Sequence, residues 1–166
     1  GINWTQRTSS FGTTIILNVI YSGSLFVAVG ASGKLATSVD GISWTQRTSS
    51  FGTSIIYGVT YSGSLYVAVG AAGKLATSSD GISWTQRTSS FTTSIIYSIS
   101  YGLGYYVACG GEGKIATSLD GSIWTQRTQP AGPLTLRDID FGSATFFIGG
   151  ANGTAIYSTD AISWTA

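Results

Sequence analysis

Residues 55–87 decide the fold, and they read IIYGVTYSGSLYVAVGAAGKLATSSDGISWTQR. Four short runs rich in β-branched and aromatic residues follow one another here, which is typical of β-strands. We expect strands at 55–61, 65–69, 74–78 and 82–87. Small and glycine-containing turns separate them, and the last turn holds the Asp80-Gly81 pair that favours a hairpin. No segment is long and periodic enough for a helix, so the pattern predicts four antiparallel strands.

The same pattern recurs along the chain at a spacing of 40 residues. Tryptophan marks it five times, at Trp4, Trp44, Trp84, Trp124 and Trp164. The chain divides into units 1–40, 41–80, 81–120 and 121–160, and residues 161–166 repeat the opening element. The fourth unit has diverged most, with Gln129-Pro130-Ala131-Gly132-Pro133 in place of Ser-Ser-Phe-Gly-Thr. Self-similarity at this period is the signature of a repeat protein.

Four short strands per repeat predict an all-β fold, a β-propeller of four four-stranded blades in one domain, 1–166. A β-helix is the competing solenoid, although its coils are usually shorter. The outer strand of a blade is expected at 1–7, and the repeat units at 14–47, 54–87, 94–127 and 134–166.

Closure of the ring has several possible forms, because both ends carry a copy of the outer strand and a four-bladed ring has one vacancy. One copy is expected to pair with Gly153–Ser158, while the other adds to an edge, frays or reaches another chain. Two chains that join into an eight-bladed ring, and an excised arc of a longer array, are the alternatives.

The composition restricts the partners and the chemistry. Of 166 residues only 9% are charged, and the net charge is +1. This argues against nucleic acid or an anionic membrane as a partner, because both require a concentrated basic patch. Histidine is absent, which removes the usual general base and the commonest metal ligand.

The single cysteine, Cys109, stands where the first two repeats have valine, so we expect a small buried hydrophobe and no disulfide. No cofactor and no metal site is expected. No apolar run reaches the length of a membrane span, and no signal peptide is visible. Methionine is absent, so Gly1 is expected to result from processing or excision.

The hairpin Ser38-Val39-Asp40-Gly41-Ile42-Ser43-Trp44 and its copies resemble the Asp-box (BNR-like) repeat of sialidase-type propellers, with one residue fewer between Asp and Trp. The longer string from Tyr61 to Thr85 is similar to the repeats of photosystem-II-assembly-factor-like propellers of bacteria and phage. The resemblance covers the whole chain. It implies a propeller fold, a structural role for the Asp-box residues, and a location outside the cell or on a virion or cell surface.

Turn chemistry accounts for the repeated aspartates and tryptophans without a catalytic or Ca²⁺-binding role. An aspartate at the start of a tight turn can accept backbone N–H groups, glycine supplies the positive φ, and tryptophan can pack between blades. The residues assigned to this structural role are Asp40, Asp80, Asp120, Asp160, Trp44, Trp84, Trp124 and Trp164.

Three groups of residues are candidate ligand contacts. Phe11, Phe51 and Phe91 fall in loops between blades, where they can stack on sugars or plug gaps. Arg47 and Arg87 belong to a repeated arginine series that can form a ring of positive charge or hydrogen-bond groups between blades. The third group, specific to the fourth unit, is Arg137, Asp138 and Asp140.

This third group lies on a predicted inner strand, where it can form a ligand or ion site, or a structural salt bridge. Lys34, Lys74 and Lys114 fall in turns and are expected to be solvated. The segment Gly110–Lys114 lacks the spacing and the following helix of a phosphate loop.

The sequence favours a non-enzymatic, lectin-like recognition module that binds glycan or a protein surface through the loops between blades. The alternative is a structural or assembly component of a phage or bacterial surface that forms homo-oligomers by exchange of the spare edge strand. An enzyme such as a glycosidase needs two carboxylates at a set separation. Only Glu112, Asp138 and Asp140 stand outside the turns, so no catalytic residue is expected.

Overall fold

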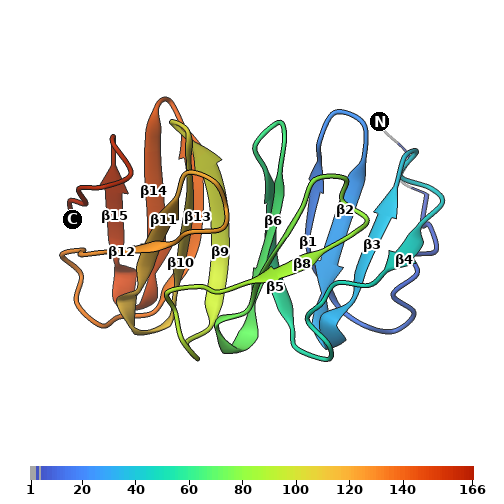
Figure 1. Cartoon of the computed structure of the whole chain (residues 1–166), viewed down its shortest axis with the longest axis horizontal. Helices are drawn as coiled ribbons and strands as arrows, with labels where there is room; N and C mark the ends of the chain where they lie inside the picture. Colours follow the sequence, from blue (N-terminus) through green and yellow to red (C-terminus); the bar gives the residue numbers. More distant parts are fainter. Residues whose placement is uncertain (1–2, 4) are drawn as a thin grey trace.

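The computed structural model describes residue 3 and residues 5–166, and this part of the chain is all β. Its strands form four separate antiparallel sheets that follow one another along the chain (Figure 1). The first sheet contains β1 (Ile16–Tyr21), β2 (Phe26–Gly30), β3 (Leu35–Ser38) and β4 (Thr45–Arg47). The second contains β5 (Ile56–Tyr61), β6 (Tyr66–Gly70), β7 (Leu75–Ser78) and β8 (Thr85–Arg87).

The third and fourth sheets repeat this meander. The third contains β9 (Ile96–Gly102), β10 (Tyr105–Gly110), β11 (Ile115–Ser118) and β12 (Thr125–Arg127). The fourth contains β13 (Leu136–Gly142), β14 (Thr145–Gly150) and β15 (Ala155–Ser158). One turn of 3₁₀ helix joins the second and third strands of each sheet, at η1 (Ala31–Gly33), η2 (Ala71–Gly73), η3 (Gly111–Gly113) and η4 (Ala151–Gly153).

A close backbone approach explains the glycine that ends the second strand of all four sheets. A Cβ on Gly70 would lie 2.2 Å from the carbonyl oxygen of Ile55. That same oxygen accepts a 2.9 Å hydrogen bond from the backbone N–H of Ala71. Any side chain at position 70 would therefore break the junction between the loop and the sheet.

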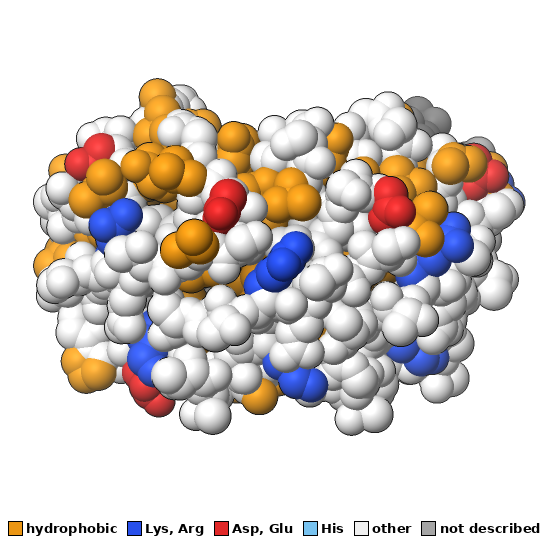
Figure 2. Space-filling view, viewed as in Figure 1, with side chains coloured by type: hydrophobic (Ala, Val, Ile, Leu, Met, Phe, Trp, Pro, Cys, Tyr) orange, Lys and Arg blue, Asp and Glu red, His pale blue; other side chains and the backbone are white. Residues whose placement is uncertain are grey.

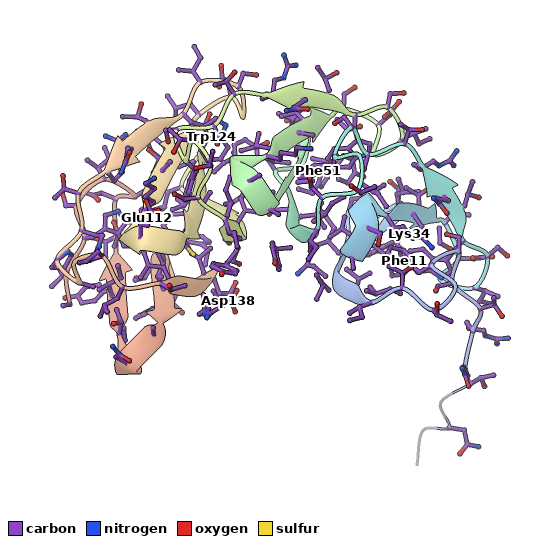
Figure 3. The ribbon with its side chains drawn as sticks, turned by 90° about the horizontal axis from the view of Figure 1, so that it is seen from below. Phe11, Lys34, Phe51, Glu112, Trp124 and Asp138 are labelled. Carbon is purple, nitrogen blue, oxygen red and sulfur yellow. The ribbon has the colours of Figure 1, made fainter. Side chains whose placement is uncertain are left out.

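The four sheets fan around a common centre and form an arc that is open on one side (Figure 3). The first strands of the sheets lie on its inner, concave side, where β5 packs against β1 and β9, and β9 packs against β13. The short fourth strands lie on the outer side. The first and fourth sheets stand at the two ends of the arc, so the described part of the chain forms no closed ring.

We call the boundary between consecutive sheets a seam, and the face that a sheet turns toward the next one its forward face. The first seam joins the forward-face residues Val27, Val29 and Leu35 to Ile56, Val59, Tyr66, Ala68 and Ala76 on the backward face of the second sheet. The second seam joins Val67, Val69 and Leu75 to Ile96, Ile99, Tyr106, Ala108 and Ala116. The third joins Val107, Cys109 and Ile115 to Leu136, Ile139, Phe146, Ile148 and Ile156. The core is thus one apolar interface used three times.

The fourth sheet differs from the expected four strands, because it has three strands and one further bridge. Tyr157 and Thr165 exchange two backbone hydrogen bonds of 2.8 and 3.0 Å. The C-terminal copy of the tryptophan element therefore occupies the edge at 153–158. In the N-terminal copy, residue 3 and residues 5–7 lie outside the strands, and Gly1, Ile2 and Trp4 lie outside the described residues.

The outermost strand is shorter than expected in the first three sheets. The predicted strand at 82–87 begins only at Thr85, because Ile82 and Ser83 donate their backbone N–H groups to Asp80 and remain part of the turn. In the part of the chain that is described, no helix has the length and apolar character needed to cross a membrane.

Candidate functional site

The concave side of the arc carries one exposed or half-buried side chain from each sheet, at the same place in every repeat. A β-bulge interrupts the pairing of the first strand with the second, between Ile56 and Gly58 in the second sheet. The other three sheets have the bulge at the equivalent position. The extra residue has no partner in the ladder, and in no sheet does it belong to the apolar cluster of a seam. We call these four residues, Leu17, Tyr57, Tyr97 and Arg137, the bulge row.

Three members of the bulge row, Tyr57, Tyr97 and Arg137, contact one another in sequence. The rings of Tyr57 and Tyr97 have centroids 5.3 Å apart and are tilted by 58°. The Arg137 guanidinium carbon lies 4.7 Å from the centroid of the Tyr97 ring, within the range of a cation–π interaction. Leu17 and Arg137 are exposed, while the two tyrosines are half-buried. The row therefore runs from an aliphatic end, over two aromatic rings, to a cation.

Two carboxylates follow Arg137 along β13, and the first of them, Asp138, projects on the concave side (Figure 3). Asp138 Oδ1 accepts a 2.7 Å hydrogen bond from Ser98 Oγ, which links the third and fourth sheets. Asp140 Oδ1 accepts the backbone N–H of Phe141 at 2.8 Å. Within the described chain, neither aspartate forms an ion pair with Arg137. Arg137 stacks on a ring and keeps its N–H donors available, so the structural salt bridge considered from sequence does not form here.

The three loop phenylalanines lie inside the molecule. Phe11, Phe51 and Phe91 are each 1% exposed. Phe51 belongs to the first seam and Phe91 to the second, while Phe11 packs on the backward face of the first sheet. A ring enclosed to this extent has no free face for a sugar, so in this structure these residues act as packing groups.

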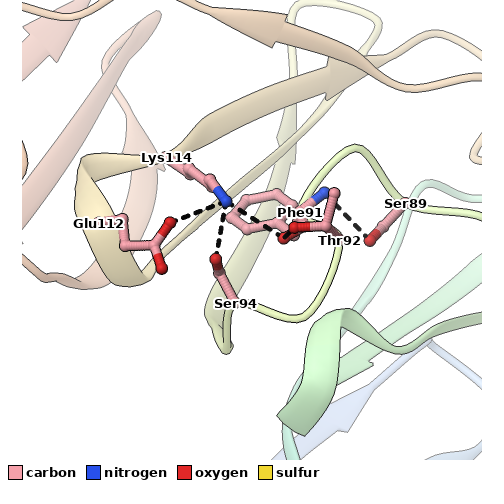
Figure 4. Close-up of polar contacts among 6 residues, drawn as sticks. All are labelled: Ser89, Phe91, Thr92, Ser94, Glu112 and Lys114. Atoms are coloured by element: carbon pink, nitrogen blue, oxygen red, sulfur yellow. Dashed lines mark hydrogen bonds and ion pairs between the residues drawn. The ribbon is translucent and has the colours of Figure 1, made fainter.

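Lysines that the sequence suggested were solvated instead hold these loops in place, which corrects that expectation. Lys34 Nζ donates to the Phe11 carbonyl oxygen at 2.7 Å, and Lys74 Nζ to that of Phe51 at 2.9 Å. Lys114 Nζ donates to Phe91 at 3.3 Å and to Ser94 Oγ at 2.7 Å, and pairs with Glu112 at 2.9 Å (Figure 4). Each partner carbonyl lies 23 residues earlier in the chain, so local sequence carries no sign of the contact.

The repeated arginines lie on the outer strands. Arg47 Nε donates to Thr37 Oγ1 at 2.9 Å and Arg87 Nε to Thr77 Oγ1 at 3.0 Å, within their own sheets. A shallow hollow beside each of them is lined by the Gln-Arg-Thr-Ser segment and the preceding Gly-Lys turn. Figure 2, viewed from the side where β8 and β12 lie, shows charged side chains scattered among uncharged ones. The arginines therefore do not merge into one basic surface on this side.

Hydrogen bonds within the hairpin account for the repeated aspartates. Asp80 Oδ1 accepts the backbone N–H groups of Ile82 and Ser83, both at 2.8 Å, and the Ser78 hydroxyl at 2.8 Å. The bonds from Ser83 and Ile82 lower the pKa of Asp80 from 3.8 to about 2. Similar bonds lower the pKa of Asp40 and Asp160 to about 2 and also lower that of Asp120. These carboxylates remain ionised at neutral pH and have no proton to donate.

The tryptophans close the same hairpins. Trp84 Nε1 donates to the Gly81 carbonyl oxygen at 3.0 Å, and its ring centroid lies 6.3 Å from that of Tyr66. Trp44 and Trp124 make the equivalent hydrogen bond, and Trp164 is buried against the third seam. Among the described residues, no group of three His, Cys, Asp or Glu side chains is arranged to hold a metal ion.

The bulge row was only partly found from the sequence. Arg137 was singled out because it is charged, whereas Leu17, Tyr57 and Tyr97 were missed because they read as ordinary members of a strand. One signal was available, because this position varies among Leu, Tyr, Tyr and Arg while its neighbours at 16, 56, 96 and 136 stay aliphatic.

Comparison with known proteins places the chain among the β-propellers. No family model matches it, and no curated protein matches it by sequence. Among solved structures it is similar to YCF48 bound to a D1 peptide, with 18% identity and a TM-score of 0.73 over 92% of this chain. It is also similar to the WD40 β-propeller domain of Doa1, with 13% identity and a TM-score of 0.68 over 90% of this chain.

A third similar structure is the computationally designed Ika4 protein, with 15% identity and a TM-score of 0.70 over 93% of this chain. This chain covers 98% of Ika4 but only about half of the other two, 52% of the YCF48 chain and 53% of the Doa1 chain. At these identities the likeness establishes the fold, and the chain is an open arc of propeller blades.

Proposed function

We propose that this chain is a non-enzymatic binding module that takes a segment of another protein along the bulge row. The observation that carries the proposal is the stack of Tyr57, Tyr97 and Arg137, with ring centroids 5.3 Å apart and a guanidinium 4.7 Å above the second ring. Tyrosine and arginine are the residue types that contribute most often to protein–protein hot spots. They are preorganised here by one another, which lowers the entropy lost on binding.

The chemistry of the row favours a peptide with an apolar or aromatic side chain followed by an acidic one. The apolar group would lie on Leu17 and Tyr57, and the carboxylate would accept the free N–H donors of Arg137. YCF48, which shares the fold, is described as bound to a D1 peptide. This supports a peptide ligand for a propeller of this shape and says nothing about its sequence here.

A protein ligand fits the row better than a glycan does. A sugar stacks on the open face of an aromatic ring. Here Arg137 covers one face of the Tyr97 ring and Tyr57 packs against the same ring at a tilt, so Tyr97 offers little open face. The buried phenylalanines Phe11, Phe51 and Phe91 offer no replacement. Glycan binding therefore becomes the competing outcome of the test.

Catalysis is disfavoured by the state of the carboxylates. Four of the seven acidic residues are held ionised in hairpins, and Glu112 is paired with Lys114, which lowers its pKa. Only Asp138 and Asp140 remain. Both of their side chains are exposed to solvent, outside any enclosed pocket of the kind in which catalytic carboxylates lie.

The test is selection of a random dodecapeptide phage library on the immobilised chain. A triple variant, Tyr57→Leu, Tyr97→Leu and Arg137→Leu, places at each bulge the residue that the first sheet already carries there, so the fold is retained. Enriched peptides should lose at least about tenfold in affinity for this variant. Arg87→Leu, which removes an arginine outside the row, should leave their affinity unchanged.

Two results would overturn the proposal. One is a set of enriched peptides that bind the triple variant as well as the parent chain. The other is a glycan array on which the parent chain binds a sugar, the triple variant does not, and no peptide depends on the row.

Self-association by strand exchange is a second candidate. The Thr5-Gln6-Arg7 segment repeats the sequence that forms β4, β8 and β12, yet it lies outside the strands here. If it adds to the edge of a second copy, deletion of residues 1–7 should abolish a dimer detected by light scattering. A dimer that survives the deletion would exclude this route.

A further inference from the structure

Each of the three seams joins the forward face of one sheet to the backward face of the next. At the ends of the arc, the backward face of the first sheet and the forward face of the fourth sheet have no such partner among the described residues. Val59 on the backward face of the second sheet is 3% exposed, and its counterpart Val19 on the first sheet is 55% exposed. On forward faces, Val107 of the third sheet is fully buried, and its counterpart Phe147 on the fourth is 58% exposed. Each end is therefore an apolar face that lacks the sheet which covers its counterparts.

The exposed surfaces are continuous patches of the kind found at interaction sites. On the first sheet the patch consists of Ile16, Val19 and Tyr21, exposed by 43, 55 and 57%. On the fourth sheet the paired residues Phe147 and Tyr157 have ring centroids 6.1 Å apart and are both exposed. They occupy the positions of Val67 and Thr77, which are buried in the second seam.

A polar detail shows that the two end faces match each other. In the first seam the Tyr66 hydroxyl donates to Ser22 Oγ at 2.7 Å, and in the second Tyr106 donates to Ser62 Oγ. In the third seam both partners change together, to Phe146 and Gly102. The corresponding residues at the ends of the arc are Phe26 on the first sheet and Gly142 on the fourth.

The pair Gly142 and Phe26 repeats the pairing of the third seam. If the two end faces packed on unrelated surfaces, the loss of the tyrosine hydroxyl at position 26 would be independent of the loss of the serine at position 142. A tyrosine at 26 opposite a glycine would lose its serine acceptor, and only a backbone carbonyl, of the kind that Leu65 offers to Tyr106 at 3.1 Å, would remain for the hydroxyl. The match therefore favours a seam between the fourth sheet of one copy and the first sheet of another.

We infer that two copies of this chain join head to tail through these end faces and close an eight-bladed ring with two identical new seams. Both ends of the arc face its open side (Figure 3), so a second arc placed across the opening meets both. This chain covers 52% of the YCF48 chain and 53% of the Doa1 propeller chain, so in both cases the matched arc is about half of a longer chain of the same fold. Because head-to-tail contacts either close or polymerise, the geometry also predicts the stoichiometry.

One charged side chain, Asp140, would be unfavourable in the proposed seam, and this provides a further test. Asp140 pairs with Phe147 and shares its face, where the first three sheets have Ile20, Thr60 and Ser100. A carboxylate placed against the first sheet of a second copy loses hydration without gaining a cation. Asp140→Thr, which installs the residue of the second sheet, should therefore tighten the dimer at least threefold.

The primary test is the mass of the 166-residue chain by light scattering and sedimentation equilibrium. We expect twice 17.2 kDa, diluting to 17.2 kDa. Val19→Asp should give the single-chain mass at concentrations where the parent is dimeric, and its thermal unfolding as a monomer should be unchanged because the site is open in the arc. Val39→Asp is the matched control, since Val39 is 75% exposed on a hairpin away from the end faces, and it should remain dimeric.

A second test asks whether Phe26 and Gly142 meet. These residues lie in the first and fourth sheets of one chain. If they do not meet in a dimer seam, the fold-changes that Phe26→Tyr and Gly142→Ser cause in the dissociation constant of the dimer should simply multiply. In the seam, the double variant recreates the Tyr66–Ser22 hydrogen bond and should bind at least threefold more tightly than the product of the single effects predicts.

Four results would overturn the inference. The first is a single-chain mass at concentrations up to about 100 µM, where an interface of standard size is occupied. The second is the formation of open polymers in place of dimers. The others are a Val19→Asp variant that stays dimeric, and effects of the substitutions at positions 26 and 142 that are independent of each other. Loss of the dimer on deletion of residues 1–7, with no effect of Val19→Asp, would assign self-association to strand exchange instead.

Discussion

Lys74 Nζ lies 2.9 Å from the carbonyl oxygen of Phe51, a residue in the loop between the first and second sheets. This contact fixes the loop at the point where the Phe51 ring enters the first seam. The same contact recurs at Lys34 and Lys114. The fourth sheet has Thr154 at this position, and the loop that precedes it has Ala131 where the other three loops have phenylalanine.

Replacement of Lys74 by methionine should destabilise the chain by about 1 kcal/mol, because the Phe51 carbonyl loses a charged donor while the aliphatic stem is kept. The free energy of unfolding in urea checks this. Lys74→Arg, which retains donors, should recover part of the loss. A methionine variant as stable as the parent would mean that water replaces the ammonium group without cost.

Truncation of Phe91 to alanine should cost about 3–5 kcal/mol, since the ring is 1% exposed and fills the second seam. Ile42→Ala is the control, because Ile42 is 50% exposed and its removal should change the free energy of unfolding by less than about 0.5 kcal/mol. Equal effects of the two substitutions would show that the loop ring is not part of the core.

Acid should unfold the chain through its hairpin aspartates. The pKa of Asp40, Asp80 and Asp160 is about 2 in the folded state, below the ordinary value of 3.8, so folding favours the ionised form. Their contribution to stability is complete above the unfolded pKa near 4 and is lost as the pH falls toward 2. Thermal unfolding followed by circular dichroism should show a midpoint that is flat above pH 5 and drops between pH 4 and pH 2. In Asp80→Asn this drop should be smaller.

Cys109 should be inert in the folded chain. The thiol is fully buried in the third seam, and burial raises its pKa far above the ordinary value, so little nucleophilic thiolate is present at neutral pH. Ellman's reagent should react only after denaturation. The reaction rate in low urea then reports the opening of the third seam, and rapid labelling of the native chain would contradict the packing described here.

The hydrogen bond between Tyr66 and Ser22 offers a test inside a single chain. Tyr66→Phe alone removes one of the two donors to the Ser22 hydroxyl, the other being the Leu25 N–H, while the double variant with Ser22→Gly copies the third seam. We expect a coupling free energy of about 0.5–1.5 kcal/mol between the two positions in urea unfolding. Additive effects would show that the two residues are independent.

The sequence was sufficient for the sheets and their turns, because these depend on local chemistry. Asp80 bonds only to Ser78, Ile82 and Ser83, within three residues of its own position, and the strand positions follow from the alternation around them. The limits of the outermost strand were wrong, since Asp80 holds Ile82 and Ser83 in the turn.

Most residues of the bulge row could not be predicted from the sequence, for a physical reason. A bulge breaks the two-residue period, so Tyr57 follows Ile56 without any sign that it points elsewhere. The lysine contacts join residues 23 positions apart and depend on tertiary packing. The buried state of Phe51 was one of two interpretations, and only the packing of two sheets distinguishes them.

The bulge has a consequence for how this repeat can diversify. Because the extra residue belongs to neither packed face, a substitution there leaves both seams of its sheet intact, and the four copies already hold Leu17, Tyr57, Tyr97 and Arg137 without altering the surrounding backbone register. Each unit thus contributes one side chain that can change without disturbing either seam, so repeats that share one backbone can present different chemistry on the inner surface.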